Sequence, residues 1–211
     1  MAVKGSELKR IFAVIPAAGE SRRMGRAKLL LPLEGRSVIA RLLDALGGDP
    51  IEARVVVVRP GDDALCKEAE GAGATVVVPQ SPPPDMRASV KHAIDFIACN
   101  FGPTDADSWL LVPADHPVLE RAIVRSIVDT CQRSDAKIVV PTFQGRSGHP
   151  TLFRWELARE VENVPPDRGL DWLLEKHAGD VQRIELANEA ILCDLDTPEQ
   201  YERLKERFRE G

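Results

Sequence analysis

A cluster of cations lies within a short glycine-containing segment near the N-terminus. Residues 16–28 read Pro-Ala-Ala-Gly-Glu-Ser-Arg-Arg-Met-Gly-Arg-Ala-Lys and follow an apolar run. Gly19 and Gly25 permit positive φ, so several backbone N–H groups can turn toward one anion. The accompanying cations are Arg22, Arg23, Arg26 and Lys28. The segment matches neither G-x-x-x-x-G-K-[ST] nor G-x-G-x-x-G, yet it predicts a phosphate-binding loop; the alternative is a solvated basic loop.

Two acidic motifs further along carry residues that could hold a divalent cation. Asp115 lies in Pro-Ala-Asp-His-Pro at 113–117. Asp194 and Asp196 lie in Asp-Leu-Asp-Thr-Pro-Glu at 194–199, and alternate residues of a strand would share a face. Carboxylate oxygens are the ligands that a hard divalent cation prefers. Each Asp could instead cap a turn or a helix.

Composition places the chain among globular proteins. It has 211 residues, of which 44% are hydrophobic, with 28 basic residues against 33 acidic ones. The net charge of −5 argues against nucleic acid or an anionic membrane as a partner. An anionic ligand must therefore be held by a local basic site. The apolar runs are strand-sized and no secretory signal pattern is present, so we expect no membrane segment and no signal peptide.

The cysteines are scattered along the chain. Cys66, Cys99, Cys131 and Cys193 form no C-x-x-C pair, which argues against a zinc knuckle or a thioredoxin-type motif. Scattered thiols are typical of a reducing compartment, and we expect a cytoplasmic protein.

Strand and helix patterns alternate through residue 140. Apolar β-branched runs predict the strands, and amphipathic segments after capping residues predict the helices. The strands are expected at 11–15, 53–58, 74–78, 108–112 and 136–140, and the helices at 37–46, 62–70, 86–99 and 119–131. The alternation indicates right-handed βαβ units and a parallel sheet covered by helices on both faces.

The alternation loosens after residue 140. Short strands are expected at 151–153, 181–186 and 190–194, with a helix at 169–177. A last helix is expected after Thr197, because Thr, Pro and Glu in succession favour a helix start. The unusual loops at 16–28, 79–89 and 113–117 follow strands, and ligands of such sheets bind beyond the carboxyl ends of the strands.

The first loop resembles a known nucleotide-binding signature. Its pattern P-A-A-G-x-S-x-R-M-G-x-x-K-x-L-L-x-x-x-G is similar to that of MobA-like nucleotidyltransferases, above all their molybdenum cofactor cytidylyltransferase branch. The guanylyltransferase branch has L-A-G-G where this chain has Ala17-Ala18-Gly19, which favours a pyrimidine nucleotide. The resemblance implies one domain over 1–211. It also implies an α/β fold with three α/β/α layers and a mostly parallel, Rossmann-like sheet of the nucleotide-diphospho-sugar transferase type.

Later segments resemble further motifs of that family in the same order. Residues 113–117 resemble P-A-D-x-P, whose Asp binds Mg²⁺. Residues 194–201 resemble D-x-D-T-P-E-D-Y, with Gln200 at the last acidic position. Residues 145–150 resemble the acceptor-side loop G-x-R-G-H-P, with Ser147 at the Arg position.

A further similarity, to G-M-x-x-S-(L/V), covers residues 85–90. Here Asp85 stands at the Gly position, and the resemblance puts Ser89 near the nucleotide base. Ser89 could instead be a polar residue of a helix start, and His149 a loop histidine bonded to backbone.

The resemblance implies a role for each motif residue. Catalytic roles fall to Arg23, Lys28 and Asp115. Mg²⁺ binding falls to Asp115 and to Asp196, which we favour over Asp194 as the second ligand. Nucleotide contacts fall to Ala17, Ala18, Gly19, Ser21, Arg22, Gly25, Gln80 and Ser89. Acceptor contacts fall to Arg146, Gly148, His149 and Pro150, so the N-terminal half binds the nucleotide and the C-terminal half the acceptor.

The implied reaction joins a nucleoside monophosphate to a phosphorylated acceptor. The acceptor phosphate attacks the α-phosphorus of a nucleoside triphosphate, most simply CTP, and pyrophosphate leaves. The closest branch implies molybdopterin or molybdenum cofactor as the acceptor, and a molybdenum hydroxylase as a client enzyme. No protein nucleophile is needed, because the acceptor phosphate is already an anion.

Other activities stay open. Methylerythritol-phosphate cytidylyltransferases have D-A-A-R-P where this chain has Ala114-Asp115-His116-Pro117, and sugar-phosphate nucleotidyltransferases have G-T-R after the first Gly. One alternative is a cytidylyl-, guanylyl- or uridylyltransferase for another phosphorylated acceptor. A second is a non-catalytic molybdenum cofactor carrier, against which the retained Lys28, Asp115 and Asp196 argue. A nucleic-acid-binding regulator is disfavoured because aromatic platforms are few.

Overall fold

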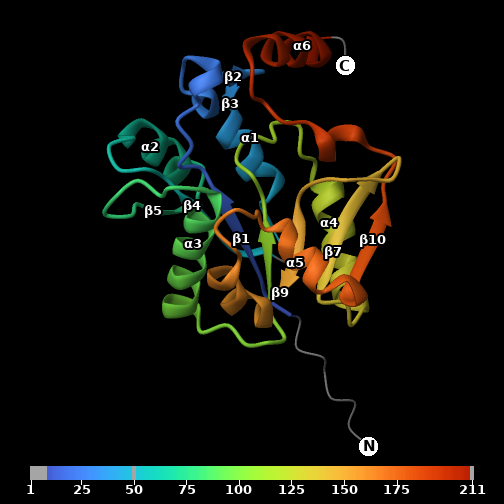
Figure 1. Ribbon diagram of the computed structural model, residues 1–211. Helices are drawn as coiled ribbons and strands as arrows, with labels where there is room; N and C mark the ends of the chain where they lie inside the picture. Colours follow the sequence, from blue (N-terminus) through green and yellow to red (C-terminus); the bar gives the residue numbers. More distant parts are fainter. Residues whose placement is uncertain (1–8, 49–50, 210–211) are drawn as a thin grey trace, which may run out of the picture.

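A mixed eight-stranded sheet forms the centre of the molecule (Figure 1). The computed structural model describes residues 9–48 and 51–209, without the side chains of Arg22 and Arg209. The strand order is β10-β7-β9-β6-β1-β4-β5, with β8 paired to β7. The strands are β1 (Ile11–Pro16), β4 (Ile51–Val57), β5 (Thr75–Val77), β6 (Ser108–Leu111), β7 (Ile138–Phe143), β8 (Arg146–Ser147), β9 (Thr151–Arg154) and β10 (Val181–Glu185).

The sheet is mostly parallel, as the alternating pattern predicts. β1 pairs in parallel with β4 and with β6, and β4 pairs in parallel with β5. β9 runs antiparallel between β6 and β7, and β10 is parallel to β7. Ile11–Ile15 are fully buried, because both faces of this central strand are covered.

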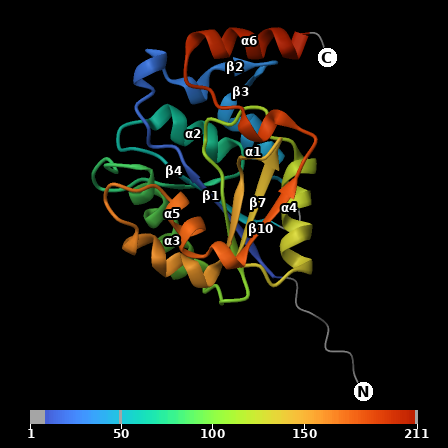
Figure 2. The ribbon, with the colours of Figure 1, turned by 45° about the vertical axis from the view of Figure 1, so that its right-hand side comes forward.

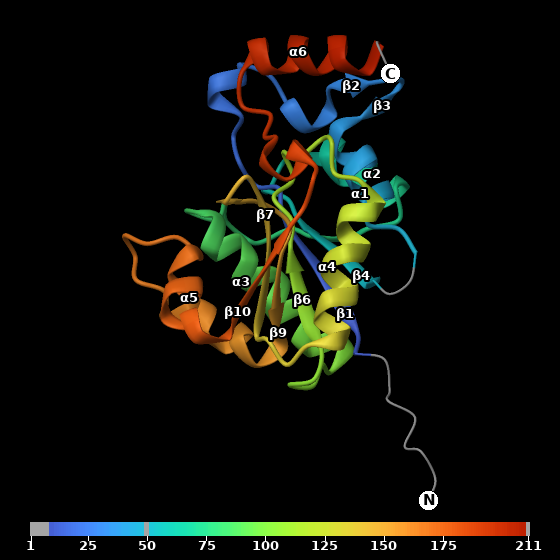
Figure 3. The same ribbon diagram turned by 90° about the vertical axis from the view of Figure 1, so that its right-hand side faces the viewer.

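Helices cover both faces, so the molecule has three layers (Figures 2 and 3). The apolar sides of α1 (Val38–Ala45), α2 (Asp63–Gly71) and α4 (Arg121–Arg133) join one core cluster. α3 (Met86–Phe101), α5 (Asp171–Lys176) and the 3₁₀ segment η3 (Trp155–Asn163) join the cluster on the opposite face. The expected helix starts are present: Ser37, Asp62 and Asp85 each accept a backbone N–H from three residues on, at 3.1, 3.3 and 2.7 Å.

A small substructure lies above the carboxyl edge of the sheet (Figure 3). It contains the short hairpin of β2 (Pro32–Leu33) and β3 (Arg36–Ser37), and the last helix, α6 (Pro198–Arg209). Tyr201 of α6 donates its hydroxyl to the carbonyl of Pro32 at 2.6 Å, which ties the helix to the hairpin. The short 3₁₀ turns η1 (Arg22–Met24) and η2 (Lys28–Leu30) lead from β1 into this hairpin.

Several short segments differ from the pattern-based expectation. The strand expected at 190–194 is wrong: Glu189–Leu192 form a 3₁₀ turn, η5, because the Asn188 side chain accepts the N–H of Ala190 at 2.9 Å and starts a turn. The 3₁₀ segment η3 (Trp155–Asn163) was not expected, although Leu157, Ala158 and Val161 recur at helical spacing and are buried. A further 3₁₀ turn, η4 (Ala178–Asp180), precedes β10. Among the described helices, none is long and apolar enough to span a bilayer.

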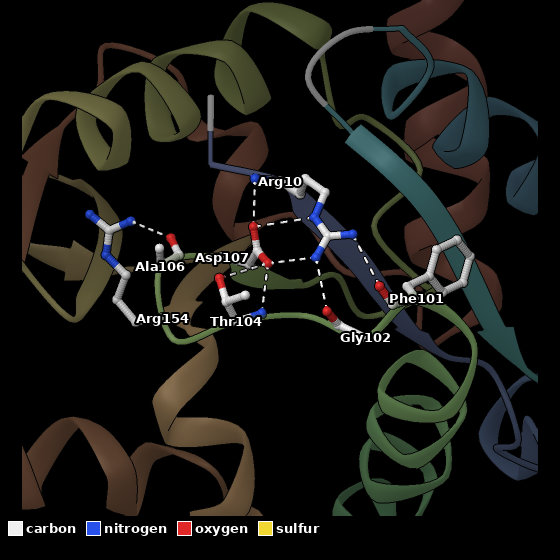
Figure 4. A network of polar contacts seen from close by, with 7 residues as sticks. All are labelled: Arg10, Phe101, Gly102, Thr104, Ala106, Asp107 and Arg154. Carbon is white, nitrogen blue, oxygen red and sulfur yellow. Dashed lines mark hydrogen bonds and ion pairs between the residues drawn. The ribbon is translucent and has the colours of Figure 1, made fainter. Parts of the chain in front are cut away.

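A polar network joins β1 to β6 at the edge of the sheet opposite the carboxyl ends (Figure 4). The Asp107 carboxylate accepts the backbone N–H of Arg10 at 3.0 Å and its guanidinium at 2.8 Å. It also accepts the backbone N–H of Thr104 at 2.8 Å. Arg10 donates further to the carbonyls at the end of α3, Phe101 (3.1 Å) and Gly102 (3.2 Å). Burial would raise the pKa of Asp107, but these hydrogen bonds lower it below the usual value.

We predict that Asp107→Asn destabilises the fold by about 2 to 3 kcal/mol, because an amide NH₂ would face the donors that the carboxylate now accepts. Urea unfolding at pH 7 measures this loss. The folded pKa is depressed, so the stabilisation is present above the ordinary pKa of 3.8 and is lost as the pH falls through the folded value. The difference between wild type and variant should therefore shrink at pH 3. Asp95→Asn, at an exposed pair with Lys91, is the control and should change little.

Candidate active site

The loops after β1 and β6 meet at the carboxyl edge of the sheet. β1 lies between β4 and β6, so the chain leaves β1 at a topological switch point. The first loop carries Lys28 and the second carries Asp115. The N–H of Leu195 donates to the carbonyl of Asp115 at 2.9 Å and attaches the segment that precedes α6. Three segments far apart in the sequence therefore converge on one point.

Lys28 lies between two carboxylates at this point. Its Nζ donates to Asp115 Oδ2 at 2.7 Å and to Asp196 Oδ1 at 2.9 Å. Arg23 donates to the second oxygen of Asp196 at 2.7 Å. The Lys28 side chain is 14% exposed, whereas that of Arg23 is 72% exposed. The structure thus brings together the residues to which catalysis and metal binding were assigned.

The charges in this cluster stabilise one another. Burial opposes the charge of Lys28, but the attraction of Asp115 and the hydrogen bonds to both carboxylates raise the pKa of Lys28 above its usual value. Burial would raise the pKa of Asp196, but the hydrogen bond and charge of Lys28, with help from Arg23, lower it. Lys28 and Asp196 are therefore both charged at neutral pH.

A capping box holds Asp196 in place. Gln200 Oε1 accepts the N–H groups of Asp196 and Thr197 at 2.7 and 2.8 Å, and Thr197 Oγ1 accepts the N–H of Gln200 at 3.3 Å. The Gln at the family's last acidic position thus has a structural task. The two candidate ligands therefore have different partners. Asp194 accepts from Gln200 Nε2 at 3.2 Å, whereas Asp196 accepts from Lys28. Asp194 and Asp196 share no strand face, since 190–194 is not a strand.

The donor set fits a divalent cation that binds together with a nucleotide. Asp115 and Asp196 each place one oxygen no more than 2.9 Å from the same nitrogen, so one small cation can reach both. Within residues 9–48 and 51–209, no group of three or more His, Cys, Asp or Glu side chains is placed to hold a metal. Two carboxylates without further protein ligands suit Mg²⁺, which completes its octahedron with water and phosphate oxygens.

A cavity of about 680 Å³ opens beside the cluster, within the size range of small-molecule sites. Ala18 and Gly19 of the first loop form one side, and Asp115 lies at one end. Pro82–Pro84 and Ser89, at the start of α3, line the wall. Ser89 donates its hydroxyl to the Asp85 carbonyl at 3.3 Å, so its oxygen can still accept a hydrogen bond from a ligand.

The backbone of the first loop is only partly available for a ligand. Ala18 is half-buried and Gly19 is exposed, and their N–H groups have no hydrogen-bond partner within the described part of the chain. The N–H of Ala17 instead donates to the Val57 carbonyl at 2.9 Å, and Ala17 is buried, so it cannot contact a nucleotide through this group. Gln80 is exposed and does not line the cavity.

Of the two glycines that permit positive φ in this loop, only Gly25 adopts it. Gly25 has φ +67°, whereas Gly19 does not adopt positive φ and Ser21 does, at 51°. The Ser21 carbonyl accepts the N–H groups of Met24 and Gly25 at 3.0 and 3.1 Å, which closes a tight turn. Ser21, Gly25 and Lys28 line a second cavity of about 350 Å³ beneath the loop. The assignment of Arg22 lies outside the described side chains.

The loop at 145–150 reaches the Asp115 loop from the other side. The rings of His149 and His116 meet edge to face with centroids 5.3 Å apart. The N–H of His149 donates to the Ile191 carbonyl at 2.9 Å, and that of Gly148 to the Pro141 carbonyl at 2.9 Å. The backbone N–H of His149 thus bonds to another backbone group, as the alternative interpretation of a loop histidine predicts. Its ring faces the ring of His116, the residue after Asp115. Pro150 is buried, whereas Arg146 is exposed.

Both histidines are neutral at pH 7. Burial and the neighbouring His116 lower the pKa of His149 to about 4. Burial also lowers the pKa of His116. Nδ1 of His149 is buried with no partner among the described residues.

Sequence reasoning missed two residues of the site. His116 fell at a variable motif position, although a His beside the metal-site Asp was a usable signal. Arg59 lines both cavities and lies two residues after the end of β4. Its place after a strand of a parallel sheet was the only signal, and nothing showed that β4 neighbours β1.

The geometry defines a nucleotide-binding protein with a Rossmann-like α/β/α fold, and the comparisons name the family. Residues 13–181 match the model of the MobA-like NTP transferase domain. The chain belongs to this family and is a nucleotidyltransferase with the fold of the nucleotide-diphospho-sugar transferase type.

Three relatives illustrate the similarity. The molybdenum cofactor cytidylyltransferase of Escherichia coli K12 is 27% identical over 206 residues, which cover 96% of this chain and all of the relative. A probable molybdenum cofactor guanylyltransferase of Mycobacterium avium is 26% identical, over 89% of this chain and 91% of the relative. The crystal structure of Rv0371C from Mycobacterium tuberculosis H37Rv in complex with manganese superposes with a TM-score of 0.74 at 23% identity. That superposition covers 94% of this chain and 99% of the other.

We predict that Gly148→Ala destabilises the protein by about 1 to 3 kcal/mol, because a Cβ there would overlap the Ile191 carbonyl and lie 2.8 Å from Ile191 Cγ1. Relief requires a shift of the loop that carries His149 or of the Ile191 backbone. Urea unfolding measures the loss. Gly179→Ala is the matched control, since nothing lies within 4 Å of its added Cβ. Equal stability of the two variants would contradict the tight packing of this loop.

Proposed function

We propose that this nucleotidyltransferase transfers CMP from CTP to a phosphorylated acceptor, with molybdopterin or molybdenum cofactor as the acceptor, and releases pyrophosphate. The observation that carries the proposal is the cluster of Lys28 between Asp115 and Asp196 at the end of the cavity. An acceptor phosphate is already a nucleophile, so the protein needs to position two anionic substrates and neutralise charge. This cluster contains cations that can bind the anionic substrates and carboxylates that can hold a metal.

In this proposal the first loop binds the triphosphate. The N–H groups of Ala18 and Gly19 donate to phosphate oxygens, and Lys28 and Arg23 balance the charge that grows on the leaving pyrophosphate. Asp115 and Asp196 would hold Mg²⁺, which would supply Lewis-acid activation of the α-phosphorus. Ser89 faces the base, where its oxygen accepts from an amino group.

The acceptor enters from the side of the 145–150 loop. His149 and His116 present neutral rings there, and Arg146 is an exposed cation at the rim. A neutral imidazole can donate a hydrogen bond to a phosphate or a pterin through one ring nitrogen, and it adds no positive charge beside the proposed metal site. A molybdenum hydroxylase that receives the product and a cytoplasmic location belong to the same proposal. Of the four free cysteines, only Cys99 is exposed, which suits a reducing compartment.

The similarity to both transferase branches makes the nucleotide the point to test. We predict Mg²⁺-dependent release of pyrophosphate from CTP when molybdenum cofactor is present, and little release with GTP, UTP or ATP. A coupled pyrophosphate assay with each nucleotide, with and without the acceptor, measures this. GTP-dependent release would replace CMP by GMP in the proposal. Binding of CTP without any transfer would contradict the enzymatic reading of the site and favour a carrier.

The two carboxylates of the last motif provide a matched pair of variants. We predict that Asp196→Asn lowers the transfer rate at least about a hundredfold, because it removes a charge at the proposed metal site. Asp194→Asn should stay within about threefold of wild type, since Asp194 bonds to Gln200 instead. The rates under saturating substrates decide this. The opposite ranking would make Asp194 the ligand and contradict the proposed geometry.

A further inference from the structure

Lys28 is bound at the position that a metal between the two carboxylates would take. Its Nζ contacts one oxygen of Asp115 and one of Asp196, at 2.7 and 2.9 Å. Its side chain is mostly buried. A divalent cation that binds both carboxylates needs distances near 2 Å to the same oxygens. The ammonium and the metal therefore compete for one place.

The charges of the cluster are balanced without a metal. Asp115 and Asp196 face Lys28, and the second oxygen of Asp196 faces Arg23. Two negative charges thus meet two positive ones. A divalent cation added to this neutral group would meet the full repulsion of a lysine that has no other carboxylate partner among the described residues.

A nucleotide changes this balance. A nucleoside triphosphate brings about four negative charges to a loop whose Lys28 and Arg23 contact the carboxylates. Lys28 can then turn from the carboxylates to phosphate oxygens, which lie on the side of its own loop. Asp115 and Asp196 are released together for the metal, and the phosphates supply the remaining ligands.

We propose that Lys28 is a built-in counter-ion that keeps the metal site closed until a nucleotide binds. This inference rests on the proposed function and concerns the order of binding at the same site. Free metal binds weakly, and the nucleotide opens the site by drawing Lys28 away. Because coupling between two ligands is reciprocal, the metal must raise the affinity for the nucleotide by the same factor.

Binding of Mn²⁺ in the absence of nucleotide tests the inference. It can be followed by electron paramagnetic resonance of the free ion. Lys28→Met removes the competing charge, so its affinity for Mn²⁺ should exceed that of wild type at least fivefold. Lys28→Arg retains the charge and should bind Mn²⁺ as weakly as wild type. If the affinity of Lys28→Met for Mn²⁺ exceeds that of wild type by less than fivefold, the inference is overturned.

A second charge in the same loop provides the matched control. Arg26 contacts neither carboxylate and lies over the ring of Tyr201, 5.2 Å from its centroid. Arg26→Met removes one positive charge from the loop and should leave the affinity for Mn²⁺ unchanged within about twofold. An equal gain in Arg26→Met and Lys28→Met would mean a general field effect and would overturn the direct competition.

The test is separable from that of the proposed function. Wild type that binds Mn²⁺ weakly alone, binds CTP and transfers CMP supports the function, whatever Lys28→Met does. If Lys28→Met does not fold, as judged by circular dichroism, Lys28→Gln replaces it, because it keeps a donor but no charge. The nucleotide-induced gain in Mn²⁺ affinity should also be smaller in either neutral variant than in wild type; an undiminished gain overturns the inference.

Discussion

The hydrogen bonds of Lys28 with Asp115 and Asp196 are the interaction on which the arrangement of the site depends. They join the loop after β1, the loop after β6 and the segment before α6. An ammonium with two carboxylate partners remains charged even when it is mostly buried, and it holds both acids at one point. The same geometry explains why the site suits a nucleotide with its metal, since both bring charges that can replace those already paired.

Contacts at both edges of the sheet position the residues of this interaction. The central strands β1 and β6 run in parallel, so their carboxyl ends present their loops side by side. At the opposite edge, Asp107 and Arg10 tie the starts of the same two strands together and to the end of α3. The capping box of Thr197 and Gln200 then turns Asp196 inward. The polar network that stabilises the fold and the cluster proposed for catalysis thus lie at opposite edges of one sheet.

Much of this arrangement could be predicted from local patterns, and the rest depends on contacts distant in sequence. The βαβ alternation predicted the parallel sheet, and the loop cations and Asp motifs predicted the residues that meet at its edge. The 3₁₀ turn at Glu189–Leu192 was missed because one side-chain cap, at Asn188, outweighs a short apolar run. The burial of Ala17, the role of Gln200 and the site position of His116 follow only from which strands and loops become neighbours. The sequence pattern indicated both Asp194 and Asp196 as candidate metal ligands. Only the fold shows that, of the two, Asp196 bonds to Lys28 and Asp194 to Gln200.

The position of the metal in a crystal grown with Mn²⁺ and a non-hydrolysable CTP analogue tests the central claim most directly. Anomalous scattering locates the metal independently of the refined side chains. The account predicts a peak within coordination distance of one oxygen each of Asp115 and Asp196, with Lys28 bonded to phosphate oxygens. A metal bound elsewhere, or Lys28 still bonded to both carboxylates in the occupied site, would contradict it.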